Sequence, residues 1–323
     1  MKVIKLANPR GFCAGVDRAI DIVSIALEKF GAPIYVRHEV VHNRKVVEDL
    51  KKKGAIFVKE LSEIPEDGIT VFSAHGVSEK VEQDAHQRKL KFFDATCPLV
   101  SKVHKEVIRF GLAGKDIVMI GHKNHPEVEG TIGRFPEESS GNMYLVENVD
   151  QAKTISIKQP DNLYLVTQTT LSVTDTKEII TELKKRFPAI QEPNSEDICY
   201  ATQNRQDAVK QLALETQLIL VVGSENSSNS NRLKELAVKS GSRSYLVDDP
   251  DQISKEMLKN VSALGITAGA SAPEDLVQSI VRKCISFGYS NEEELDGLEE
   301  NIYFKLPAAV SYTHLRAHET GYN

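Results

Sequence analysis

Three cysteines, Cys13, Cys97 and Cys199, each stand immediately before a stretch with the hydrophobic periodicity of a helix. The apolar positions on these faces are Val16, Ile20, Val23, Leu27 and Phe30 after the first cysteine, Val100, Val103, Val107 and Phe110 after the second, and Ala208, Leu212 and Leu214 after the third. Pro98 follows the second cysteine and favours the first position of a helix. A pattern that recurs three times predicts three copies of one supersecondary unit.

Each predicted helix leads into a short apolar strand and then a polar loop. The strands are expected at residues 34–36, 117–120 and 218–222. The loops after them lie 28 to 30 residues beyond the respective cysteine and carry His42, His125, and the run Ser227, Ser228 and Asn229. A second polar loop follows in each copy, at 62, 72 and 72 residues beyond the cysteine, and carries His75, Thr169 or Ser271. Polar residues of similar kind therefore recur where strands end.

The alternation of strands and helices predicts the α/β class, with small parallel-rich sheets and right-handed crossovers. Ligands of such sheets bind beyond the carboxyl ends of the strands. Three units related by a pseudo-threefold axis, in a trefoil around a central cavity, would bring the cysteines and the polar loops together. We expect the units at residues 1–96, 97–198 and 199–290, with a closing segment at 291–307. Residues 308–323 continue no earlier pattern and are expected to be a non-native tail, in which His314 and His318 bind no metal.

Charge and hydropathy exclude several classes of partner. The chain has 323 residues, 40 Lys and Arg against 46 Asp and Glu, a formal net charge of −6 and no basic block. Such a chain lacks the electrostatic footprint of a protein that binds nucleic acid or an anionic membrane surface. No stretch approaches 18 consecutive apolar residues, and Met1 runs into an apolar strand without a secretory or transit pattern. We therefore expect a cytoplasmic protein that binds neither nucleic acid nor membrane.

The cysteines need a chemical explanation, because four scattered cysteines without a CxxC pair suit neither a disulfide scaffold nor a zinc ribbon. A helix N-terminus biases a thiol towards thiolate, and Arg18, Lys102 and Arg205, five or six residues after each cysteine, are expected to strengthen that bias. Three thiolates repel one another unless a positive group lies between them, which favours a metal centre. Zinc is one alternative, and an iron–sulfur cluster with an open iron for substrate is another. Buried structural cysteines and a disulfide switch remain further alternatives.

The fourth cysteine, Cys284, has a simpler interpretation. Its neighbours along an amphipathic helical pattern are Leu276, Val277, Ile280, Val281 and Ile285. A free cysteine in such a position behaves as a small apolar residue, so we expect Cys284 to fill a hydrophobic core.

The polar loops offer groups suited to an anionic ligand. His125 and Glu127 lie two residues apart after a strand, and Pro126 and Glu127 suit the first turn of a helix. Residues 73–76 and 227–231 are rich in hydrogen-bond donors, which suit phosphate oxygens near a helix N-terminus. Neither a Walker A nor a GxGxxG pattern is present in the sequence, so nucleotide binding has no support.

Nine segments together resemble those of the 4-hydroxy-3-methylbut-2-enyl diphosphate reductases, the family that completes the methylerythritol phosphate route to isoprenoids. They are residues 10–16, 42–43, 73–77, 94–98, 121–127, 167–172, 197–202, 227–232 and 267–273. The resemblance extends to about Pro307. It implies a trefoil of three α/β units around one [4Fe–4S] cluster and a reductive dehydroxylation that yields isopentenyl and dimethylallyl diphosphates. It also implies an external electron donor of flavodoxin or ferredoxin type.

The resemblance implies a role for each matching residue. Cys13, Cys97 and Cys199 match the three cluster ligands, which leaves one iron open, and Glu127 matches the acid that delivers protons. Thr169 matches a position near the substrate hydroxyl. The positions that match the diphosphate-binding residues are His42, His75, His125, Ser227, Ser228, Asn229 and Ser271. Protonated histidines are expected to supply both charge and hydrogen bonds to the diphosphate.

Two other functions are compatible with three converging thiolates. An iron–sulfur hydro-lyase would use the open iron without net electron transfer, and it would therefore need no external reductant. A non-enzymatic metal or redox sensor would use the same cysteines but would have no reason to carry the repeated histidine and serine/asparagine loops.

Overall fold

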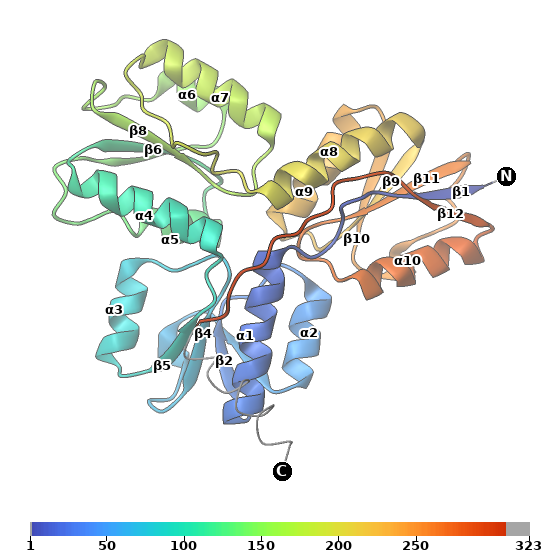
Figure 1. The fold of residues 1–323 in the computed structure, drawn as a ribbon, viewed down its shortest axis with the longest axis horizontal. Helices are drawn as coiled ribbons and strands as arrows, with labels where there is room; N and C mark the ends of the chain where they lie inside the picture. Colours follow the sequence, from blue (N-terminus) through green and yellow to red (C-terminus); the bar gives the residue numbers. More distant parts are fainter. Residues whose placement is uncertain (1, 308–323) are drawn as a thin grey trace.

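The computed structural model describes residues 2–307 as three α/β units arranged around a common centre, in the trefoil shown in Figure 1. The described residues contain sheets of five, four and three strands. Every pairing between their strands is parallel. The predicted fold class is confirmed. The expected tail, 308–323, lies outside the described residues.

Each unit begins with the helix that the cysteine pattern predicted. Cys13, Cys97 and Cys199 are the N-cap residues of α1 (Ala14–Phe30), α4 (Pro98–Leu112) and α8 (Tyr200–Glu215). An N-cap residue lies beside backbone N–H groups that have no partner within the helix. All three cysteines are thus held at equivalent places by the same local structure.

The first sheet has the strand order β3-β2-β4-β5. Its elements after α1 are β2 (Ile34–Arg37), α2 (Arg44–Lys52), β3 (Ala55–Val58), the 3-10 helix η1 (Leu61–Glu63), β4 (Ile69–Phe72), α3 (Glu79–Gln87) and β5 (Lys91–Asp94). The apolar face of α1 buries Ala19, Ile22 and Val23 in one cluster with Ile34 and Val71 of the sheet. This packing fixes the orientation of α1 and therefore the position of Cys13 at its N-terminus.

The second sheet has the order β7-β6-β8. Its unit comprises α4, β6 (Asp116–Ile120), α5 (Pro126–Ile132), β7 (Met143–Val146), α6 (Val149–Thr154), β8 (Leu163–Thr167) and α7 (Val173–Arg186). The central strand β6 and its neighbour β8 are buried along their whole length, as parallel strands covered on both faces are.

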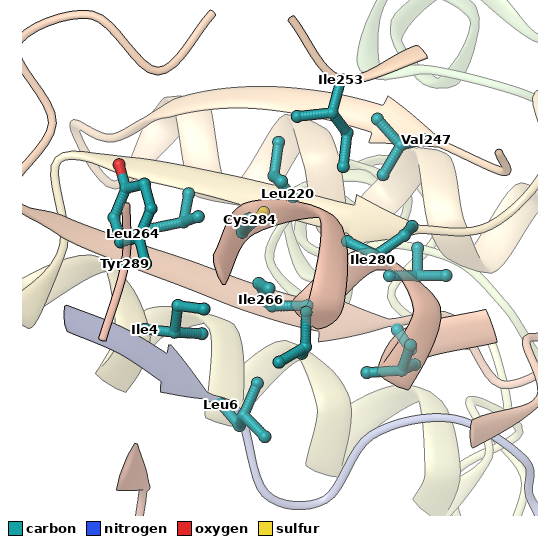
Figure 2. Close-up of a cluster of buried hydrophobic side chains, with 14 of the residues drawn as sticks. Ile4, Leu6, Leu220, Val247, Ile253, Leu264, Ile266, Ile280, Cys284 and Tyr289 are labelled. Carbon is teal, nitrogen blue, oxygen red and sulfur yellow. The ribbon is translucent and has the colours of Figure 1, made fainter. Parts of the chain in front are cut away.

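The third sheet has the order β10-β9-β11-β1-β12 and contains the first and the last strand of the described chain. Its elements after α8 are β9 (Leu218–Val222), α9 (Ser228–Lys239), β10 (Arg243–Val247), the 3-10 helix η2 (Pro250–Gln252), β11 (Ala263–Ala268), α10 (Glu274–Ser286), β12 (Asn291–Glu294) and the N-terminal β1 (Val3–Leu6). Cys284 of α10 is fully buried in the core of this unit, as expected (Figure 2).

The placement of β1 differs from the division expected at residue 96, which put this strand in the first unit. Val3 pairs with Ala263 of β11 on one side and with Asn291 of β12 on the other. Ile4 and Leu6 lie in the same buried cluster as Ile280 of α10 (Figure 2). A strand of four residues, three of them apolar, suits any of the three sheets, and only the long-range pairing decides between them. The division of the chain into units therefore stays a proposal, with β1 belonging to the third.

Residues 295–307 follow β12 and run from the third unit past the centre of the trefoil to the first unit (Figure 1). The backbone N–H of Leu295 donates to the carbonyl of Leu6, and Leu306 packs against the core of the first unit. We call these residues the C-terminal strap, because they connect the third unit to the first. No helix among the described residues is long and apolar enough to cross a membrane.

Candidate active site

All twelve residues that the sequence analysis singled out line one cavity of about 110 Å³ at the centre of the trefoil. They are Cys13, His42, His75, Cys97, His125, Glu127, Thr169, Cys199, Ser227, Ser228, Asn229 and Ser271. Every unit contributes a helix N-terminus and two loops that follow parallel strands. The convergence expected from the matched offsets is therefore present, although the chemical role of each residue stays a prediction.

The sulfur atoms approach one another around Gly15, in the first turn of α1. A Cβ atom added to Gly15 would lie 2.7 Å from the Sγ of Cys97 and 3.9 Å from the Sγ of Cys13. The Sγ of Cys199 accepts a hydrogen bond from the backbone N–H of Thr202 at 3.4 Å, within the first turn of α8. All three cysteines are free thiols. Glycine at position 15 leaves space between two thiols that any side chain would fill.

Burial outweighs the helix N-termini in setting the protonation of these thiols. Desolvation raises the pKa of Cys97 to about 12 and that of Cys199 to about 11, and it also raises the pKa of Cys13. The nearby backbone N–H groups lower each pKa by less, and the guanidinium of Arg205 lowers that of Cys13. The expected bias towards thiolate is thus wrong for the ligand-free cavity. A bound cationic group would be needed to hold three thiolates here.

The donor set fits an iron–sulfur cluster. Three thiols from three units border a single cavity, and the absence of a side chain at Gly15 lets the thiol of Cys97 lie close to α1. Distant cysteines presented together by a fold are a known way to bind such clusters. Among residues 2–307, no three His, Cys, Asp or Glu side chains are grouped closely enough to hold a single metal ion.

Three histidines gather on one side of the cavity. The ring centroids of His42 and His75 lie 4.1 Å apart, and that of His125 lies 5.6 and 5.8 Å from them. Burial lowers the pKa of His75 well below its ordinary value and that of His125 to about 3, and the neighbouring histidines lower both further. These two rings therefore favour the neutral form in the ligand-free cavity, and their protonation by a bound diphosphate stays a prediction. An anion between them would reverse the balance, because its charge favours the imidazolium form.

Two of these rings have defined hydrogen bonds. The backbone N–H of Glu127 donates to Nδ1 of His125 at 3.2 Å, so the neutral ring carries its proton on Nε2. His42 lies with Nδ1 3.2 Å from a carboxylate oxygen of Glu39, while its Nε2 is buried without a partner. Asn226, from the third unit, donates to the same oxygen of Glu39 at 2.6 Å. The acid therefore holds His42 and connects two units.

Glu39 and Asn226 were missed by the sequence analysis. Hydrogen bonding from His42 is the largest cause that lowers the pKa of Glu39, and Asn226 adds to it. The one available signal was an acid three residues before a histidine in a loop after a strand. That pattern is common on protein surfaces, and only the pairing with the third unit distinguishes it.

Glu127 lies in the first turn of α5 and is almost completely buried, with 3% of its surface exposed. Its carboxylate accepts a hydrogen bond from the backbone N–H of Thr169 at 2.7 Å and one from the hydroxyl of Thr169 at 3.1 Å. Desolvation nevertheless raises the pKa of Glu127 to about 7. A carboxylic acid with this pKa can hold and release a proton near neutral pH, as a general acid must.

Hydrogen bonds hold the remaining loops in place, both within the third unit and between units. The hydroxyl of Ser271 donates to the carbonyl of His42 at 2.9 Å, and the amide oxygen of Asn229 accepts from the backbone N–H of Ala270 at 2.8 Å. Ser227 is the N-cap of α9, and the hydroxyl of Ser228 lies 3.1 Å from that of Thr170. Helix α9 therefore presents its N-terminus to the cavity, where an anion is favoured.

A larger cavity, of about 1070 Å³, lies elsewhere, between α3 and the segment that follows α5. Its charged lining residues include Glu79, Asp84 and Glu137, and it contains neither cysteine nor histidine. Size alone therefore does not identify the functional site. The smaller central cavity has the titratable groups with shifted pKa values that mark sites of chemistry.

Comparison with known proteins shows which family the chain is similar to. Residues 4–285 match a family model described as LytB protein. The chain is 59% identical over 307 residues to the 4-hydroxy-3-methylbut-2-enyl diphosphate reductase of Alcanivorax borkumensis, covering 95% of this chain and 99% of the relative. The reductase of Haemophilus influenzae is also 59% identical over 307 residues, which is 95% of this chain and 97% of that one.

Two solved structures are similar over most of the chain. The E-1-hydroxy-2-methyl-but-2-enyl-4-diphosphate reductase of Plasmodium falciparum superposes with a TM-score of 0.92 at 39% identity and covers 98% of this chain and 99% of its own. A second structure, of an (E)-4-hydroxy-3-methyl-but-2-enyl diphosphate reductase described as the terminal enzyme of the non-mevalonate pathway, has a TM-score of 0.62 at 29% identity. It covers 88% of this chain and 100% of its own.

Proposed function

The chain belongs to the LytB family, and from this premise we propose that its central cavity converts 4-hydroxy-3-methylbut-2-enyl diphosphate into isopentenyl diphosphate and dimethylallyl diphosphate. It is an iron–sulfur oxidoreductase of the non-mevalonate isoprenoid pathway that acts on a diphosphate with electrons from a donor. The observation that carries the proposal is the convergence of three thiols, three histidines and a buried acid from three units on one cavity.

Cys13, Cys97 and Cys199 are the proposed ligands of one [4Fe–4S] cluster, with one iron left open. The cluster would supply electrons and a Lewis acid for the substrate oxygen. The support lies in the placement of each thiol at a helix N-terminus and in Gly15, which lets the thiol of Cys97 approach α1 closely. These helix ends add backbone N–H groups that stabilise thiolates once a cationic group is bound.

The diphosphate is proposed to lie among the three histidines and the N-terminus of α9. Nε2 of His42 is buried without a partner, and Nε2 of His125 carries a proton that it can donate. Ser227, Ser228, Asn229 and Ser271 border the same space from the third unit. Because burial disfavours protonated His75 and His125, binding of a polyanion should be accompanied by proton uptake.

Glu127 is the proposed general acid. Reduction of the allylic alcohol consumes two electrons and two protons, breaks the C–O bond and releases water. Glu127 can protonate the departing oxygen because burial keeps the carboxylic acid neutral up to about pH 7. Thr169, whose N–H and hydroxyl both reach this carboxylate, holds it in place near the position proposed for the substrate hydroxyl. Diphosphate binding at a distance would fix the reacting carbon beside this acid.

The electron donor is proposed to be of flavodoxin or ferredoxin type, and the enzyme to be cytoplasmic. One anaerobic preparation tests the whole proposal: it should be brown, contain iron and sulfide, and reduce the allylic diphosphate only when a reductant is added. A colourless preparation with stoichiometric zinc would favour the zinc alternative. Turnover without a donor would favour a hydro-lyase, and failure to bind any diphosphate would favour a sensor.

A further inference from the structure

Each of the three cysteine-capped helices carries a cation five or six residues after its cysteine, and each cation contacts the residues that lead into the cysteine of another unit. Nη1 of Arg18, on α1, donates to the carbonyl of Thr96 at 3.0 Å. Thr96 immediately precedes Cys97 of the second unit. Nε of the same guanidinium donates to the carbonyl of Lys305 in the C-terminal strap at 3.0 Å.

The second cation continues the same pattern. Nζ of Lys102, on α4, donates to the carbonyl of Ser195 at 2.7 Å and to a carboxylate oxygen of Asp197 at 2.9 Å. The side chain of Asp197 is fully buried, and its other oxygen accepts from the backbone N–H of Thr167 at 2.9 Å. These contacts fix the turn that leads into Cys199 of the third unit.

The third cation, Arg205, contacts the residues before the cysteine of the first unit. Arg205, on α8, is a completely buried arginine whose Nη2 donates to the carbonyls of Gly11 at 2.7 Å and Phe12 at 3.0 Å. These carbonyls lie directly before Cys13 of the first unit. Glu300 of the C-terminal strap pairs with the other edge of the guanidinium at 3.0 Å. Buried arginine is rare unless its charge and donors are satisfied, and here both are.

We propose that Arg18, Lys102 and Arg205 form a closed ring of positioning residues, in which each unit holds the cysteine turn of the next. The direction is constant: the first unit holds the second, the second holds the third, and the third holds the first. A head-to-tail contact repeated around a pseudo-threefold axis closes on itself, as heterologous contacts do in cyclic oligomers. The ring keeps the three thiols convergent before any cluster is bound.

The proposal rests on the proposed function only for the identity of the bound group. Outer contacts that orient metal ligands commonly change metal affinity by about 10–100-fold when they are removed. The contacts described here act on the backbone before each cysteine, so their loss should loosen the following turn rather than the helix that carries the cation.

Hydrogen–deuterium exchange of the full chain without cluster tests the direction of the ring. Lys102→Met should accelerate exchange at residues 195–199, Arg18→Met at 95–97, and Arg205→Met at 11–13. Lys105→Met on α4 and Lys210→Met on α8 are matched controls, because both lysines are exposed and lie outside the ring. Should Arg205→Met fail to fold, Arg205→Lys keeps the charge but loses the planar fork, and acceleration at 11–13 is again expected.

Cluster retention is the second readout. After anaerobic loading and exposure to a chelator, the three ring variants should lose iron about tenfold faster than the wild type or the lysine controls. The ring would be overturned by two results together. Hydrogen exchange would accelerate only in the mutated helix, or equally over the whole chain, and the variants would retain iron as well as the wild type does. A wild type that binds no iron and sulfide would instead overturn the proposed function, while the exchange pattern would still decide the ring.

Discussion

Replacement of Glu127 by glutamine tests the chemistry of the cavity without an activity assay. Burial raises the pKa of Glu127 from its ordinary value of 4.5 to about 7. Between these two values the folded chain binds more protons than the unfolded chain, so the free energy of unfolding falls as the pH rises through this window. At about 1.4 kcal/mol for each pKa unit, the destabilisation by the ionised acid amounts to about 3 kcal/mol, and most of it develops between about pH 5 and pH 8.

Glutamine resembles the protonated acid, because it offers one acceptor to the N–H of Thr169 and one donor to its hydroxyl. Glu127→Gln should therefore match the wild type in stability at about pH 5 and exceed it by about 2–3 kcal/mol at about pH 8. Urea unfolding of the unloaded chain at both pH values measures the difference. Glu129→Gln, at an exposed position of the same helix, is the matched control.

The pH dependence of unfolding decides the outcome. If Glu127→Gln and the wild type lose the same free energy of unfolding between the two pH values, Glu127 is not the buried neutral acid described here. The loaded variant gives a separate result: turnover should fall by about 10²–10⁴-fold, the usual contribution of a general acid, while iron content and diphosphate binding are kept.

Three further changes test other parts of the site. Gly15→Ala should lower iron content at least about tenfold, because its Cβ would lie 2.7 Å from the Sγ of Cys97 and would displace that thiol; normal iron content would show that the position of the thiol does not depend on Gly15. Glu39→Gln should raise KM about tenfold with little change in kcat, because His42 and Asn226 lose a shared carboxylate. Calorimetry with inorganic diphosphate should show the same loss of affinity, and an unchanged KM would remove Glu39 from positioning His42. Truncation after Pro307 should leave turnover and thermal unfolding unchanged, and loss of folding would show that the tail is native.

The sequence predicted the cavity residues because their placement depends on local rules. A residue at a helix N-cap or directly after a parallel strand has a fixed place in an α/β unit, so equal offsets from Cys13, Cys97 and Cys199 translate into equivalent places in three dimensions. The twelve residues reached one cavity without any information about which units touch. The family resemblance then assigned roles that spacing alone left open.

The sequence-based predictions failed where contacts between distant parts of the chain determine the structure. Arg18, Lys102 and Arg205 were expected to act on their own cysteines, but a residue five or six positions along a helix lies about a third of a turn off the starting face and points towards a neighbour. The thiolate bias failed because the desolvation of Cys97 and Cys199 depends on how completely three units close around them. Strand β1 was misplaced for the same reason, since its pairing partners lie more than 250 residues away.

The position of β1 has a consequence for how the molecule is made. Val3–Leu6 is synthesised before every other strand that the structure describes, yet it lies between β11 and β12, which are the last of these strands to be synthesised. The first and second units contain all strands of their sheets and can fold during synthesis, whereas the third must keep an apolar N-terminal strand waiting until residue 294 has emerged. The cavity that the third unit completes, with Cys199 and the N-terminus of α9, is therefore finished only when the chain is almost fully synthesised.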